Sequence, residues 1–246
     1  MKPVVQPAEF ERHRGRPAYG VEMRLLQSKH TFERLALIGG IAAPLILFAA
    51  IIFVGAITPH YDPFRQTISQ MGTPDSRYAD LLNGGYFVYG LLIGFAAIGF
   101  RYAFRSDRRA GLFAALMGLH ALGTVLLGVF PDAPEILAIN ESKFNAHNVV
   151  SAVAYLPLIG GGLVFYLMNA KSEALRAVSI FGLVVIAVNM PMPVITLIQS
   201  IEPVTGFLQR LFYGVTCSWL AVASWQVLSL SNPVKVKVRE IIPGLR

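Results

Sequence analysis

Six long stretches of the chain contain no Asp, Glu, Lys or Arg, and each is about as long as a bilayer is thick. They are residues 35–58, 81–100, 110–130, 149–168, 177–201 and 211–230. An α-helix needs about 20 mainly apolar residues to cross the hydrocarbon core. The pattern therefore predicts an all-α fold, a polytopic integral membrane bundle of six transmembrane helices. The bundle covers residues 35–230, between a basic N-terminal segment (1–34) and a basic tail (231–246).

Composition agrees with a membrane bundle that has no soluble domain. Hydrophobic residues make up 54% of the chain and charged residues 14%, whereas soluble domains carry about 25% charged residues. The first apolar stretch begins only at residue 35. A secretory signal would have a shorter apolar run nearer the start, so we expect the first span to stay in the mature protein.

The basic residues lie mostly on one side of the predicted spans. Seventeen of the 21 Lys and Arg residues fall before residue 35, within 101–109 and 169–176, or after residue 230. The other side holds Arg65, Arg77, Lys143 and Arg210. Because Lys and Arg favour the cytoplasmic side during insertion, both termini are predicted to be cytoplasmic. The net charge of +7 is then explained by contact with anionic membrane lipid and not by nucleic-acid binding.

The first outer loop has the pattern of a short helix. Three apolar residues, spaced by four and three positions, would share one face: Phe64, Ile68 and Met71. Asp62 is placed to cap the helix, Pro63 to begin it and Gly72 to end it. A helix lying on the outer surface is the simplest interpretation. The alternative is that Asp62, His60 and Ser69 face a cavity between the spans.

Histidines and acids gather at about one depth on the outer side: His60, Asp62, Asp132, His147 and Glu202. Such groups can act as general acid and base or bind zinc where the fold brings them together. The catalytic candidates are His60, Asp62, Asp132 and His147, and the metal candidates are His60, His147 and Asp132. No two of them have a fixed ligand spacing, so no cofactor is predicted and zinc is the alternative. Ordinary capping and solvated loops explain the same residues.

Two polar residues, His120 and Asn189, fall near the predicted midplane of the membrane. They can hydrogen-bond across the bundle, as helix-to-helix contacts or as part of a ligand site. Pro191 and Pro193 remove the backbone bonds to the carbonyls of Ala187 and Asn189, which must find other partners. Many transporters build substrate sites at such broken helices, although proline kinks often only shape a bundle.

Other residues in the spans allow two interpretations each. Asn83 is a candidate to line the same ligand cavity. Arg210, about one turn into the last stretch, can extend outward, pair with Glu202 or point at the outer cluster. Gly90 and Gly94 form a GxxxG pattern that permits close helix contact. Packing within one chain is the default interpretation, and a homodimer through these glycine-rich faces is the alternative.

Short motifs along the chain resemble a known family. They are His60-Tyr61-Asp62-Pro63, Ile68-Ser69-Gln70-Met71-Gly72, Asn83-Gly84, Phe130-Pro131 and His147. Their order is similar to that of the prokaryotic six-span family known only as domain of unknown function 998. Gln70 stands where that family more often has an acid. The resemblance implies six spans and a bacterial inner membrane, and it implies no established activity.

Three hypotheses follow. In the first, the protein binds or transports a small amphipathic molecule or lipid through an outward-facing polar cavity lined by Asn83, His120, Asn189 and Arg210. In the second, it is a membrane-embedded hydrolase-like enzyme with a His/Asp site at the outer face. In the third, it is a non-catalytic membrane scaffold.

Overall fold

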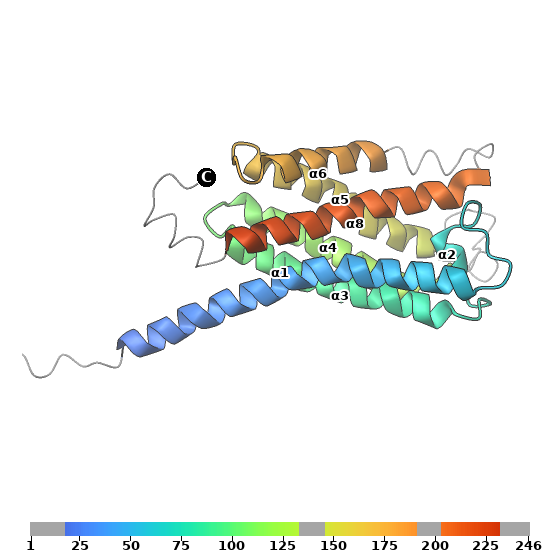
Figure 1. Ribbon diagram of the computed structural model, residues 1–246, viewed down its shortest axis with the longest axis horizontal. Coiled ribbons are helices and arrows are strands. Elements are labelled where there is room, and N and C mark those ends of the chain that lie inside the picture. Colours follow the sequence, from blue (N-terminus) through green and yellow to red (C-terminus); the bar gives the residue numbers. More distant parts are fainter. Residues whose placement is uncertain (1–17, 133–145, 191–202, 232–246) are drawn as a thin grey trace, which may run out of the picture. The chain divides into compact units, whose positions relative to one another are not determined.

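The computed structural model describes residues 18–132, 146–190 and 203–231, and every regular element in these ranges is an α-helix (Figure 1). The chain divides into two compact units, Met1–Phe32 and Glu33–Arg246. The second unit holds the bundle, which begins within the first helix. In chain order the helices are α1 (Ala18–Ile57), α2 (Ile68–Met71), α3 (Ala79–Ala103), α4 (Arg109–Val129), α5 (Ala146–Asn169), α6 (Arg176–Asn189) and α8 (Thr205–Leu230).

Five of the described helices are long and apolar enough to cross a membrane. These segments are Thr31–Ile57, Ala79–Ala103, Arg109–Val129, Val149–Asn169 and Thr205–Leu230. The predicted span 177–201 appears as α6, which is apolar but has 14 residues, and most of its remainder lies outside the described residues. The structure therefore supports an all-helical integral membrane protein. Six spans and cytoplasmic termini stay predictions.

The surface of the bundle is apolar, as a lipid environment requires. Leu45 is 66% exposed, Ile52 67% and Leu156 62%. A soluble protein seldom exposes apolar side chains over such an area. In a bilayer the same side chains contact acyl chains at no hydrophobic cost. Exposure of this kind along several helices agrees with the membrane assignment.

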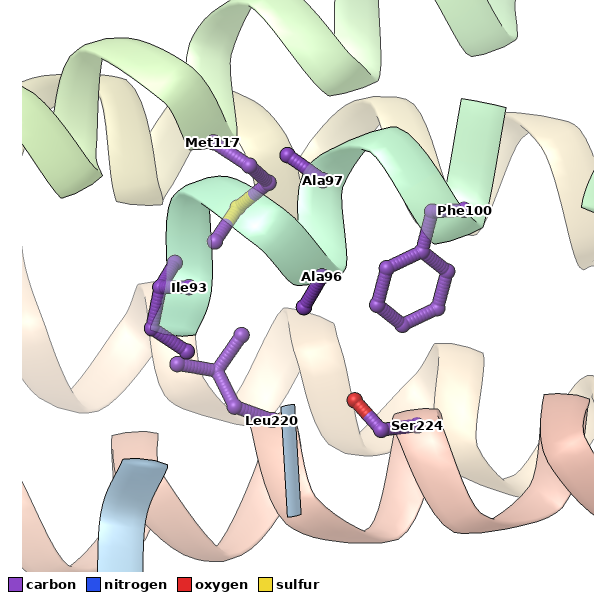
Figure 2. Close-up of a pocket in the computed structure, with 7 residues that line it drawn as sticks. All are labelled: Ile93, Ala96, Ala97, Phe100, Met117, Leu220 and Ser224. Atoms are coloured by element: carbon purple, nitrogen blue, oxygen red, sulfur yellow. The ribbon is translucent and has the colours of Figure 1, made fainter. Parts of the chain in front are cut away.

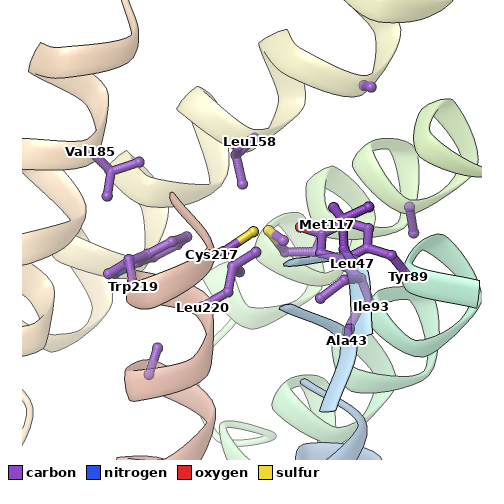
Figure 3. Packing of buried hydrophobic residues seen from close by; sticks show 14 of the residues in the cluster. Ala43, Leu47, Tyr89, Ile93, Met117, Leu158, Val185, Cys217, Trp219 and Leu220 are labelled. Carbon is purple, nitrogen blue, oxygen red and sulfur yellow. The ribbon is translucent and has the colours of Figure 1, made fainter. Parts of the chain in front are cut away.

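Consecutive helices pack against each other to form the core. α3 contacts α4, α4 contacts α5, and α5 contacts α6, while α8 closes the bundle against α2, α3 and α6. Figure 3 shows Trp219 and Leu220 of α8 in one buried cluster with Leu158 of α5 and Val185 of α6. Phe165 lies with its ring centroid 5.8 Å from that of Trp219, edge to face. This aromatic packing fixes α5 against α8.

Glycines allow these helices to touch through their backbones. A Cβ atom at Gly90 of α3 would come within 2.6 Å of the Ala121 carbonyl oxygen on α4. At Gly123 of α4, an added Cβ would overlap the backbone nitrogen of Ala154 on α5. The close contact expected at Gly90 therefore occurs within one chain. A homodimer through the glycine-rich helix faces stays a prediction.

The predicted helix of the first outer loop begins later than expected. Asp62 and Pro63 start a single turn, closed by the Gln66 N–H on the Asp62 carbonyl at 2.8 Å, and α2 itself begins at Ile68. Thr67 is the N-cap, and Gly72 ends the helix as predicted. Phe64 is 60% exposed, whereas Ile68 and Met71 are buried. The three residues do not share one face, because Thr67 in an extended conformation separates the turn from α2.

Candidate functional site

A serine and a histidine from distant parts of the chain meet beside α2. The imidazole Nε2 of His147, in the first turn of α5, lies 3.2 Å from the Ser69 hydroxyl. Its Nδ1 lies 3.0 Å from the carbonyl oxygen of Phe130, at the end of α4. Because a carbonyl only accepts hydrogen bonds, Nδ1 carries the proton in the neutral ring. Nε2 is then the acceptor, and the Ser69 hydroxyl donates to it.

This arrangement is the one that general-base catalysis requires. A base within hydrogen-bond reach of a hydroxyl, itself oriented by a third group, activates the hydroxyl as a nucleophile. In the described residues the third group is the Phe130 carbonyl, where many hydrolases have a carboxylate. His147 is buried, and Ser69 is half-buried. The pair therefore lies partly shielded from solvent at the end of the bundle that holds α2.

Four contacts hold α2, and with it Ser69, in one position. The Ile68 N–H donates to Gln209 Oε1 of α8 at 2.6 Å. Thr67 and Gln70 form a reciprocal capping box at the N-terminus of α2. Asn83 Nδ2 of α3 donates to the Gly72 carbonyl at 3.1 Å, and the side chains of Ile68 and Met71 are buried. Asn83, a ligand candidate from the sequence, thus contacts the end of α2.

Arg210 connects the loop before α2 to the start of α8. Its guanidinium donates to the carbonyls of Pro63 and Gln66, at 2.9 Å each, and to that of Gly206 at 2.8 Å. It also bonds the Tyr61 hydroxyl and lies 5.3 Å from the Tyr61 ring centroid. Burial raises the pKa of Tyr61, and nearby Arg210 opposes the shift only in part. The phenol therefore stays protonated at neutral pH and donates to the Gln66 and Thr67 carbonyls, at 3.0 Å each.

The other outer candidates differ in exposure and in contacts. His60 is exposed, with a positive φ of 59°. Asp62 Oδ1 accepts the Phe64 N–H at 2.9 Å, so Asp62 caps the single turn before α2 and not α2 itself, and its carboxylate pairs with Arg65 at 3.6 Å. Asp132 is half-buried, two residues beyond Phe130. Within the described residues, no three His, Cys, Asp or Glu side chains are grouped to hold a metal ion. Glu202 lies outside those residues.

His120 is bonded to two neighbouring helices in the bundle interior. Its Nδ1 lies 2.6 Å from the Ala154 carbonyl of α5, and its Nε2 lies 3.0 Å from the Tyr89 hydroxyl of α3. The Tyr89 and His120 rings meet edge to face, with centroids 5.8 Å apart. Both ring nitrogens thus have partners other than Asn189. Sequence reasoning did not find Tyr89, because its hydroxyl gave no polar signal within an apolar stretch.

Asn189 makes its contacts with α5, α6 and α8. Its Nδ2 donates to the Val185 carbonyl at 2.7 Å, and Thr216 Oγ1 lies 3.4 Å from its Oδ1. The Asn189 carbonyl, which Pro193 cannot reach with a backbone N–H, accepts the Tyr155 hydroxyl. A side chain of a neighbouring helix thus satisfies this carbonyl, as the proline pattern predicted. Pro191 and Pro193 themselves lie outside the described residues.

A cavity of about 10 Å³ lies between α3, α4 and α8, and Figure 2 shows its lining. The lining is apolar except for one hydroxyl: Ile93, Ala96, Ala97, Phe100, Met117, Leu220 and Ser224. Ser224 Oγ has no hydrogen-bond partner in the described part of the chain. A cavity of this size has room for about one water molecule. Neither His120 nor Asn189 lines it.

A family of known sequences matches most of the bundle. The sequence model of the family described as "Protein of unknown function (DUF998)" matches residues 41–226. The match includes α2, Ser69 and His147. No curated protein matches the chain. No solved structure matches it.

Proposed function

Since the chain belongs to the DUF998 family and is an integral membrane protein, we propose that it binds an amphipathic ester of the bilayer and cleaves or transfers its acyl group. Ser69 is the nucleophile and His147 the general base. The observation that carries the proposal is the hydrogen bond between the Ser69 hydroxyl and His147 Nε2. The Phe130 carbonyl favours the tautomer in which Nδ1 carries the proton and Nε2 can accept one.

The residues account for each proton in the reaction. Ser69 Oγ attacks the ester carbonyl carbon while its proton passes to His147 Nε2. The imidazolium then gives that proton to the departing alcohol oxygen, and the acyl group remains on Ser69. Water or a second alcohol attacks the acyl-serine in the same way and releases the product. General acid–base catalysis of this kind contributes about 10² to 10⁴ in rate.

The position of the pair favours a lipid-soluble substrate. Phe130, whose carbonyl orients His147, has a side chain that is 42% exposed, and Val129 before it is 55% exposed. These residues end α4, one of the helices long enough to span the bilayer. A substrate approaching Ser69 from this side meets apolar side chains. An ester with an acyl chain and a polar headgroup suits such an interface.

Transport of an amphipathic molecule is a less direct interpretation of the same bundle. It needs a polar cavity that reaches His120 and Asn189. In the described residues both side chains are bonded to neighbouring helices, and the cavity at Ser224 is mainly apolar. Binding at the α2 end agrees better with these contacts. Transport stays a prediction.

The test is covalent labelling of Ser69. The purified full-length protein is treated in detergent micelles with a lipophilic fluorophosphonate, which reacts with activated serine hydroxyls. We expect labelling of the wild type, no labelling of Ser69→Ala, and at least about a hundredfold slower labelling of His147→Gln, since the base is lost. Mass spectrometry of the tryptic peptides locates the adduct.

Ser76→Ala is the matched control. Ser76 lies in the same loop, and its Oγ is buried without a hydrogen-bond partner in the described residues. Its replacement removes one hydroxyl and should leave labelling unchanged. Gel filtration and thermal unfolding establish that each variant is folded. Labelling that persists in folded Ser69→Ala, or a wild type that resists the probe, refutes the proposal.

A further inference from the structure

The turn between α3 and α4 concentrates positive charge at the end of the bundle opposite α2. With the adjoining ends of the two helices, which we include in the turn from here on, it holds four arginines and one acid: Arg101, Arg105, Arg108, Arg109 and Asp107. All four arginines are exposed. What this turn can bind depends on which of the guanidinium groups already has an anionic partner.

Asp107 is fully engaged by Arg109. Arg109 NH2 lies 2.7 Å from Asp107 Oδ2, and its Nε and backbone N–H donate to Oδ1 at 3.0 and 2.8 Å. Arg109 also donates to the Leu167 carbonyl on α5. The hydrogen bonds from Arg109 hold the pKa of Asp107 below its ordinary value. The carboxylate is therefore ionised at neutral pH, and its charge neutralises Arg109.

Within the part of the chain that the structure describes, Arg101, Arg105 and Arg108 have no such partner. In the described chain the ion pairs are Arg109 with Asp107 and Arg65 with Asp62. The backbone N–H groups at the start of α4 are also occupied, since Ala110 bonds the Asp107 carbonyl at 3.1 Å and Gly111 the Arg108 carbonyl at 3.4 Å. An anion at this turn would therefore be held by side chains, not by the helix end. The guanidinium groups of Arg101, Arg105 and Arg108 provide three positive charges for such an anion.

The surroundings of the turn place these charges beside lipid. Ile98 of α3 is 45% exposed and Leu112 of α4 is 54% exposed, each within two turns of the loop. Tyr102, 47% exposed, lies between Arg101 and the loop. Tyrosines are enriched where a span meets the headgroups. The guanidinium groups thus lie at the level of lipid phosphates.

We propose that this turn binds the headgroup of an anionic phospholipid, with Arg101, Arg105 and Arg108 as its phosphate ligands. Guanidinium groups bind phosphate oxygens through paired, charge-assisted hydrogen bonds. A zwitterionic headgroup brings an ammonium group toward three guanidinium groups that have no ion-pair partner among the described residues, whereas an anionic headgroup does not. The turn therefore selects phosphatidylglycerol over phosphatidylcholine.

The test measures this selection directly. Delipidated full-length protein is incubated with equimolar phosphatidylglycerol and phosphatidylcholine in mixed micelles, and the retained lipids are counted by native mass spectrometry. We expect the wild type to retain phosphatidylglycerol preferentially, and R101Q/R105Q/R108Q to reduce that preference by at least about tenfold. Higher salt should weaken the preference, because exposed charges are screened.

R65Q/R77Q is the matched control. It removes two exposed arginines from the α2 end of the bundle, where Arg65 pairs with Asp62 and Arg77 lies over the Tyr78 ring. It should keep the preference of the wild type. If the triple variant fails to fold, the single variants R101Q, R105Q and R108Q should each reduce the preference severalfold. A wild type without preference, a folded triple variant that keeps it, or an equal loss in the control overturns the proposal.

Discussion

A single guanidinium joins the loop after α1 to the first turns of α8. Arg210 satisfies three backbone carbonyls, two of them in the loop that leads into α2. A neutral side chain at this position would remove the charged donor from all three carbonyls, and the Gln66 carbonyl would keep only the Tyr61 hydroxyl. The arginine therefore has a structural role in keeping Ser69 in place, and this role is separate from contact with a substrate.

Replacing Arg210 should destabilise the protein more than replacing Arg65, which lies in the loop that Arg210 contacts. We expect Arg210→Ala to lower the free energy of unfolding by about 1–3 kcal/mol, because the loop and α8 lose the charge-assisted hydrogen bonds that join them. Arg210→Lys should recover part of this, since an ammonium group cannot reach all three carbonyls in one geometry. Thermal or denaturant unfolding in detergent measures the difference.

Arg65→Ala provides the comparison. The Arg65 side chain is 73% exposed and pairs with Asp62 at 3.6 Å. A surface pair of this kind contributes at most about 1 kcal/mol, so this variant should resemble the wild type. Equal stability of Arg210→Ala and Arg65→Ala would contradict the structural role of Arg210.

The position of a candidate residue along its helix was predictable from the sequence, but the side of the helix on which it lies was not. Position along a helix follows from counting residues at about 1.5 Å each, which placed His147 correctly near the end of its span. The side of the helix on which a residue lies depends on packing. Ser69 therefore meets His147, 78 positions away, while His60 remains exposed. One sequence contains no signal for that pairing.

At the scale of the helices, local chemistry predicted some features well. The Tyr155 hydroxyl on the Asn189 carbonyl agrees with the expectation from the missing N–H of Pro193. The predicted start of α2 was wrong. Tyr61 and Arg210 donate hydrogen bonds to the Gln66 carbonyl, which a helix continuing through Gln66 would use for a backbone bond. Arg210 comes from α8, outside the loop segment. From the loop sequence alone, Asp62 and Pro63 are predicted to start the helix, and Thr67 is missed as its N-cap.

The contact between α4 and α5 gives an element-scale prediction. We expect Gly123→Ala to lower the free energy of unfolding by about 1–3 kcal/mol, since the added methyl group overlaps the Ala154 backbone and forces the helices apart. His120 also donates to the Ala154 carbonyl, so the separation weakens that hydrogen bond. Thermal unfolding of the purified protein measures the effect.

Gly118→Ala is the control on the same helix. A Cβ at Gly118 has no atom within 4 Å in the described structure. Alanine favours a helix over glycine by up to about 1 kcal/mol, so this variant should be as stable as the wild type or slightly more stable. A destabilisation equal to that of Gly123→Ala would show that the close α4–α5 contact does not limit stability.

At the scale of the whole molecule, the two ends of the bundle differ in charge and in chemistry. The α2 end has Asp62, Asp75 and Asp80 close to Arg65 and Arg77. The opposite end has the arginine-rich turn between α3 and α4. Because Lys and Arg favour the cytoplasmic side, the Ser69–His147 pair should face outward and the proposed lipid-binding turn inward. The two proposals then concern different leaflets of the membrane.

Cysteine labelling in intact cells tests this orientation. Cys217 is 2% exposed, so the native thiol contributes little background to labelling by a membrane-impermeant maleimide. Asp75 and Ser106 are both exposed, one in the loop after α2 and the other in the turn after α3. We expect Asp75→Cys to react in intact cells and Ser106→Cys to react only after the cells are permeabilised. The reverse pattern would place the arginine-rich turn outside, and the charge asymmetry would then not determine how this bundle inserts.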